Sequence, residues 1–211
     1  MKKQLFFLAL LFSVQMFSQS NFKSFFKLSA PIKKWVLFHP FKAKRSLTVS
    51  NEANRVSDSI AKTNLLDGDG AGGQVDAFRH GYWMARMRQE IGEGAARSLG
   101  KAHEKENYIS YKKRKLEEGI VPDEISSKMD LYNNEEGLKL ITKGSKVSRK
   151  VLIYKIVNAI NKGSFKIIKK DIKGNFLTCK GEVIAKEVLR GTWENSKCLI
   201  SSKKGKNISF N

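Results

Sequence analysis

The sequence predicts a mainly α fold: a helical bundle-like domain followed by a small C-terminal β appendage. Apolar residues recur at helical spacing in segments between residues 51 and 162. After residue 163 this pattern gives way to short β-type runs punctuated by glycines. About 190 residues remain once an N-terminal leader is removed, which is long enough for one domain with a substantial core.

Residues 1–20 have the three parts of a secretory signal peptide. Two lysines precede an apolar centre that begins at residues 5–12, and the small residues Ser18 and Ser20 stand near a plausible cleavage point. The apolar run breaks at Ser13, short of the ~20 residues that a membrane span needs, so an uncleaved anchor is the less favoured alternative. We therefore expect an exported protein, periplasmic or extracellular, with no transmembrane segment after cleavage.

The formal net charge is +20, from 40 lysines and arginines against 20 acidic residues. A surface of this charge attracts anionic partners, and we expect an anionic polymer or a lipid surface. Lysines dominate over arginines, and lysine is a point charge rather than a bidentate phosphate ligand. The alternative is a solvated lysine coat that serves solubility.

Residues 21–48 form a basic, aromatic N-terminal arm. Pro31 and Pro40 argue against a single long helix here. We expect the arm to pack its aromatic side chains on the core, and a membrane-surface segment is the alternative. The aromatic residues of the arm include Phe22, Phe25, Phe26, Trp35, Phe38 and Phe41.

The helical domain that carries the polar motifs is expected over residues 49–163. Periodicity predicts its helices over residues 51–62, 74–91, 93–115, 123–132 and 146–162, with Gly92 and Gly163 as helix stops. A glycine-rich loop at residues 67–73 precedes the second helix. Asp67 and Asp69 fit the first positions of a calcium-binding loop, but Phe78 stands where its glutamate belongs, so an ordinary flexible turn is favoured.

The sequence predicts a small β-rich tail over residues 164–211. Two β-type runs, at residues 165–168 and 176–179, are separated by a turn signal at residues 173–175. Cys179 and Cys198 are the only cysteines, and in an exported protein we expect them to form a disulfide.

Three predicted helices each carry two polar residues four positions apart, which places each pair on one helix face. We expect these faces to meet, because isolated buried polar groups are costly and groups that converge can neutralise one another. A carboxylate beside a histidine fixes its tautomer, as a general base or a metal ligand requires. The candidate site residues are Asp76, Arg79, His80, His103, Glu104, Asp130, Asn133 and Asn134.

The strings from Gly73 to Trp83, from Ala102 to Glu104 and from Met129 to Gly137 together resemble an uncharacterised family of helical bacterial domains. The family signature is D-A-F-R-H, then A-H-E, then M-D-x-x-N-N-x-x-G, and the likeness covers roughly residues 50–160. Its members occur in exported bacterial proteins and in larger toxin-like ones. The resemblance implies a helical fold and candidate residues, but no established reaction. A likeness to small secreted A2-type phospholipases is weaker, because Gly81 follows His80 where aspartate is needed and the cysteine framework is missing.

These observations favour a hydrolase-like activity in which His80 or His103 is the general base, oriented by Asp76 or Asp130. Arg79 would stabilise an anionic group, and Asn133 and Asn134 would position the substrate. The chain has no Gly-x-Ser-x-Gly motif, so attack by an activated water is expected. No cofactor is required, although zinc held by both histidines and a carboxylate is an alternative. The rival from another class is an envelope-associated binding module in which the cluster is a buried structural network.

Overall fold

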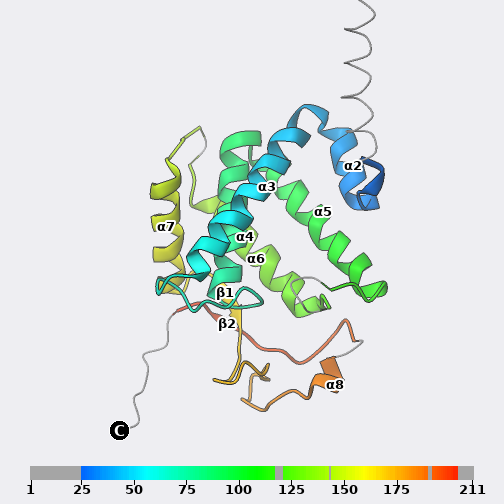
Figure 1. The fold of residues 1–211 in the computed structure, drawn as a ribbon, viewed down its shortest axis with the longest axis vertical. Coiled ribbons are helices and arrows are strands. Elements are labelled where there is room, and N and C mark those ends of the chain that lie inside the picture. The colour runs from blue at the N-terminus through cyan, green and yellow to red at the C-terminus, as the bar shows by residue number, and fades with distance from the viewer. Residues whose placement is uncertain (1–24, 117–120, 143, 190–191, 204–211) are drawn as a thin grey trace, which may run out of the picture.

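Helix α4 (Gln74–Ile91) is the element around which the other helices pack (Figure 1). It contacts α3 (Pro40–Ala61), α5 (Glu93–Lys112), α6 (Glu124–Lys139) and α7 (Arg149–Lys162). The computed structural model describes residues 25–116, 121–142, 144–189 and 192–203. The mainly α class is confirmed, and none of the helices in these ranges is both long and apolar enough to cross a membrane.

The N-terminal arm is more helical than expected. Pro31 and Pro40 stand in the first turns of α2 (Ala30–Phe38) and α3, where a missing N–H costs nothing, so each proline begins a helix. The helix predicted over residues 51–62 is therefore the second half of α3. Trp35 is buried and donates a hydrogen bond to the carbonyl of Ala95 (3.2 Å).

The expected packing of the arm's aromatic residues on the core is wrong for several of them. Phe38 is 73% exposed and Phe41 is 99% exposed, and Phe26 is also exposed. The prediction of burial holds for Trp35, whereas Phe22 lies outside the described residues.

The helix ends follow the glycines that were expected to stop them. Helix α4 has the predicted bounds, and Gly92 and Gly163 adopt φ angles of 85° and 89°, which side-chain-bearing residues rarely reach. Helix α6 extends seven residues beyond its expected end at residue 132. Its buried face is largely polar or glycine, so hydrophobic periodicity could not reveal its length.

Glu52 of α3 ties three helices together from a buried position. Its carboxylate accepts hydrogen bonds from Tyr82 (2.6 Å) and Arg86 (3.0 Å) of α4 and pairs with Arg149 (3.0 Å) of α7. Burial opposes ionisation of this carboxyl group, but the donors and positive charges outweigh burial and lower the pKa of Glu52. A charged network thus fixes α3 against α4.

The C-terminal tail lies at one end of the helical domain (Figure 1). Strand β1 (Lys166–Ile168) pairs antiparallel with β2 (Leu199–Ser201). Of the two predicted β-type runs, the first contains β1, whereas Phe176 and Leu177 of the second form isolated bridges with Lys170 and Val183.

The tail is closed on itself and anchored to the helices. The predicted disulfide between Cys179 and Cys198 is present. The ammonium group of Lys197 pairs with the carboxylate of Asp123 at 2.5 Å, and both residues are buried. Because Asp123 also caps the N-terminus of α6, this ion pair joins the tail to the helix that carries Asp130 and Asn134.

Candidate functional site

The first turns of α4 present Asp76, Arg79 and His80 on one side of the helix. Asp76 is buried, and both of its carboxylate oxygens have donors. Oδ2 accepts a hydrogen bond from the backbone N–H of Gly72 (2.7 Å), and Oδ1 pairs with Nη2 of Arg79 (2.5 Å). The charge of Asp76 also lies at the positive end of the α4 dipole.

Helix α6 brings Asp130 and Asn134 against His80. Nε2 of His80 lies 3.3 Å from Oδ1 of Asp130 and 3.4 Å from Oδ1 of Asp76, and Nδ1 lies 3.2 Å from Oδ1 of Asn134. All four side chains are buried. We call Asp76, Arg79, His80, Asp130 and Asn134 the inner cluster. Its convergence was expected from the four-residue spacing on separate helices.

Two glycines permit this approach of α6 to α4. A Cβ atom placed on Gly137 would lie 2.7 Å from the Cα of Gly81, closer than side-chain carbons come to backbone. A Cβ atom on Gly81 would lie 2.6 Å from the ring of Phe165. The backbones of the two helices therefore touch at these positions, which leaves the short side chains of Asp130 and Asn134 within reach of His80.

The imidazole of His80 is held in its neutral form. Burial disfavours the charged ring, and the positive charge of Arg79, together with that of His103 when it is protonated, adds to this effect, so the pKa of His80 lies well below its ordinary 6.5. The carboxylates of Asp76 and Asp130 act in the opposite direction. Burial is the largest of the influences on this pKa.

The ligand set suited to a metal ion differs from the one expected for zinc. Within the described residues, ligand atoms of Asp76, His80 and Asp130 lie within 4.8 Å of one another, whereas His103 is not part of this group. The guanidinium of Arg79 already occupies the cationic position beside Asp76, so an ion would have to displace it. Two carboxylates and an imidazole are donors that a divalent metal accepts, but the carboxylate of Asp76 is already paired with Arg79.

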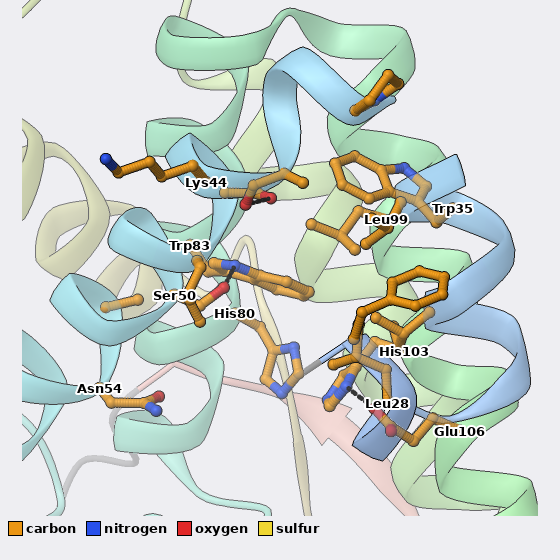
Figure 2. Close-up of a pocket in the computed structure, with 18 of the residues that line it drawn as sticks. Leu28, Trp35, Lys44, Ser50, Asn54, His80, Trp83, Leu99, His103 and Glu106 are labelled. Carbon is orange, nitrogen blue, oxygen red and sulfur yellow. Dashed lines mark hydrogen bonds and ion pairs between the residues drawn. The ribbon is translucent and has the colours of Figure 1, made fainter. Parts of the chain in front are cut away.

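A deep pocket of about 810 Å³ lies beside the inner cluster, between α2, α3, α4 and α5. Figure 2 shows His80 and His103 side by side in this pocket, and their ring centroids are 6.4 Å apart. Nδ1 of His103 faces the carboxylate of Glu106 at 3.7 Å. Arg79 also lines the pocket. The side chain of His103 is 30% exposed, whereas that of His80 is 4% exposed, so His103 is the more accessible histidine.

The structure therefore divides the residues expected to form one site. Arg79, His80 and His103 line the pocket, and Asp76, Asp130 and Asn134 lie behind them. Asn133 does not face the pocket: its side-chain amide exchanges two hydrogen bonds of 2.9 Å with the backbone of Lys166 in β1. The expectation that Asn133 positions substrate is wrong, because its donor and acceptor are committed to holding the tail.

Glu104 also lies away from the pocket lining. It is buried on α5, where its carboxylate accepts a hydrogen bond from Asn107 (3.3 Å). Glu106 was not among the residues expected to form the site. Its position three residues after His103 places both side chains on one helix face, and this spacing is the signal that could have identified it. The hydrogen bond that Gly72 donates to Asp76 could not be predicted from the sequence, because it comes from the backbone N–H and not from a side chain.

The fold and site define a class of helical domain in which a buried cluster of charged residues supports a pocket lined by two histidines. The chain belongs to a known family: the domain of unknown function DUF6973 matches residues 33–164. This match includes every residue of the inner cluster and of the His103–Glu106 pair. No curated protein and no solved structure matches the chain.

The contact between Gly81 and Gly137 supplies a test of the site's construction. We expect Gly137→Ala to lower the free energy of unfolding by about 1–3 kcal/mol, because the added methyl group forces α6 away from α4. Urea denaturation of the purified protein measures this loss.

Gly94→Ala is the matched control, since a Cβ atom there meets nothing within 4 Å. This substitution in an accessible helical turn should leave stability unchanged or raise it by up to about 1 kcal/mol. Equal stabilities of the two variants would contradict the close approach of the helices.

Proposed function

We propose that the protein is a hydrolase that attacks its substrate with a water activated by His103. The observation that carries this proposal is the arrangement of His103, Glu106, Arg79 and His80 around one part of an 810 Å³ pocket. A histidine oriented by a carboxylate, next to a cation that can stabilise negative charge, is the combination that general-base hydrolysis needs.

Glu106 is the residue that orients the base. The imidazole of His103, 3.7 Å from the Glu106 carboxylate, lowers the pKa of that carboxyl group and outweighs its burial, so the group is ionised at neutral pH. Nδ1 of His103 is directed at this carboxylate, and we assign the acceptance of a proton from water to Nε2. The water oxygen then bonds to the electrophilic atom of the substrate, and the proton held on Nε2 passes to the leaving group.

Arg79 supplies the positive charge beside this reaction. Its salt bridge to Asp76 fixes the guanidinium at the wall of the pocket, where its positive charge would stabilise a developing anion. The serines that line the pocket support attack by water rather than by a side chain. Oγ of Ser50 accepts a hydrogen bond from Trp83 (2.9 Å), and Oγ of Ser46 donates one to the carbonyl of Ala43 (2.9 Å). Neither serine is paired with a histidine as a nucleophile would be.

The inner cluster has a supporting role in this proposal. Asp76 holds Arg79, and Asp130 and Asn134 hold the neutral ring of His80 against the pocket. These residues position the groups that meet the substrate. A metal-dependent version would use Asp76, His80 and Asp130, and it predicts that dialysis against a chelator abolishes turnover and that zinc restores it.

The test is the turnover of a panel of chromogenic carboxylic and phosphoric esters by the purified protein. We expect His103→Asn to lower the turnover of whichever ester is cleaved by about 10²–10⁴-fold, the usual contribution of a general base. His39→Asn is the matched control and should retain full activity: His39 does not itself line the pocket, although Trp35, on which it stacks, does. Undiminished turnover by His103→Asn would contradict the proposal.

The alternative function is a binding module that holds its ligand in the same pocket without cleaving it. The apolar lining of the pocket favours this function as much as it favours catalysis. The two differ in one outcome: a binding module cleaves none of the esters, and its ligand affinity does not depend on the base. The His103→Asn variant therefore separates them.

Export is part of the proposal. The signal-like residues 1–20 and the Cys179–Cys198 disulfide both support a site of action outside the cytoplasm. We expect N-terminal sequencing of protein from the envelope or medium to find a start close to residues 18–21. An intact Met1 in that pool would contradict export by cleavage.

A further inference from the structure

We infer that the pocket binds the acyl chain of an anionic lipid, which α2 and the first half of α3 collect from a bilayer surface. The inference deepens the proposed function by naming its substrate class, and it rests on that function only for the reaction at the polar end. Three observations carry it: the lining of the pocket, the groups at its polar end, and the exposed surface of the same two helices.

The pocket is apolar over most of its lining. Its volume of about 810 Å³ lies within the range of roughly 300–1,000 Å³ typical of small-molecule sites. Helices α2, α3 and α5 supply its apolar side chains, which include Ile32, Trp35, Val36, Ala43, Leu47 and Leu99. Against these apolar side chains, a polar ligand would lose its hydrogen bonds to water without forming new ones. A hydrocarbon chain forms no hydrogen bonds with water, so its transfer from water to this part of the pocket is favourable.

Figure 2 shows His80, His103 and Glu106 close to one another in the pocket, whereas Lys44 and Asn54 lie on the side of α3. Arg79 adds a positive charge beside them, and Lys44 adds a second on the α3 side of the pocket. An apolar chamber with a polar, histidine-lined part matches an amphiphile that carries one hydrocarbon chain and a polar ester group.

The outer surface of α2 and α3 combines exposed apolar side chains with positive charge. Leu37, Phe38, Phe41 and Leu47 are all exposed. Residues 30–48 contain five lysines and arginines and no acidic residue. Aromatic and aliphatic side chains among lysines are the composition of helices that lie in the interface of an anionic bilayer.

An anionic polymer is the rival occupant of this surface. It would satisfy the lysines, but it would leave Phe38 and Phe41 in water and the pocket unexplained. A bilayer of anionic lipid accounts for the lysines, the exposed aromatic side chains and the adjacent apolar chamber together, so we commit to the bilayer.

The first experiment measures the affinity of the purified protein for saturated fatty acids of 8, 10, 12 and 14 carbons by isothermal titration calorimetry. Affinity should rise about fourfold for each added methylene, the ratio expected when a methylene leaves water. Ala43→Trp, which fills the pocket from α3, should weaken binding of the longest chain at least tenfold. The control Thr48→Trp adds the same side chain at an exposed position of α3 outside the lining and should bind as wild type.

An affinity that does not depend on chain length, or equal binding by Ala43→Trp and Thr48→Trp, would overturn the inference. Circular dichroism and thermal melting of both variants establish that each is folded. If Ala43→Trp does not fold, Leu47→Trp, at a largely exposed position of the lining, takes its place.

The second experiment measures sedimentation of the protein with vesicles of phosphatidylglycerol or of phosphatidylcholine. Binding should require the anionic vesicle, and replacing both Phe38 and Phe41 by serine should weaken it at least tenfold while fatty acid binding in solution stays within twofold. Tyr154→Ser is the matched control, because Tyr154 is an exposed aromatic residue (68%) of α7. Equal binding to both vesicles would contradict the requirement for an anionic lipid and overturn the inference. A Phe38/Phe41 variant that binds vesicles as wild type does and is completely displaced by polyphosphate would favour the polymer and also overturn it.

The failure of this inference is distinguishable from failure of the proposed function. Suppose that cleavage of esters depends on His103 but that the affinity for fatty acids does not depend on chain length. The proposed hydrolase activity is then supported, and binding of an acyl chain in the pocket is contradicted. If fatty acids bind as expected to both wild type and His103→Asn but no ester is cleaved, the pocket stands and the hydrolase is excluded.

Discussion

The carboxylate of Asp76 is the constraint on which the rest of the site depends. A buried carboxylate without partners would cost several kcal/mol, so the fold must surround it with donors. The backbone amide of Gly72 and the guanidinium of Arg79 meet this need, and the N-terminal end of α4 adds its dipole. These contacts fix the loop before α4, and they fix Arg79 at the wall of the pocket. The same carboxylate lies next to His80, which in turn contacts α6.

The site therefore has two layers with different duties. In the inner cluster, buried charges neutralise one another and hold the helices in register. The outer layer consists of His103 and Glu106 on one turn of α5, and two members of the inner cluster, Arg79 and His80, reach the pocket beside them. Asp76, Asp130 and Asn134 hold the helices together, and in the proposed function the residues that line the pocket meet the ligand.

Much of this arrangement could be predicted from the sequence. The bounds of α4 followed from periodicity and Gly92, and the four-residue spacing of Asp76 with His80 and of Asp130 with Asn134 correctly placed them together. Other features could not be predicted. Asn133 and Asn134 are adjacent, and adjacent residues on a helix point about 100° apart, so one reaches His80 and the other reaches β1. Which of the two faces the cluster depends on the rotation of α6, which the contact of Gly81 with Gly137 sets. The pocket depends on α2, whose place against α5 is set by the single buried Trp35.

His80 is a neutral imidazole enclosed by charged neighbours, and a pH titration by NMR measures its protonation state. The ring signals of the three histidines can be assigned by comparison with the His39→Asn and His103→Asn variants. The account predicts that the ring of His80 remains neutral as the pH falls through 6.5, the ordinary midpoint of a histidine, because burial disfavours its charged form. A His80 midpoint at or above pH 6.5 would contradict the account, since it would show a charged, stabilised ring in place of the neutral one.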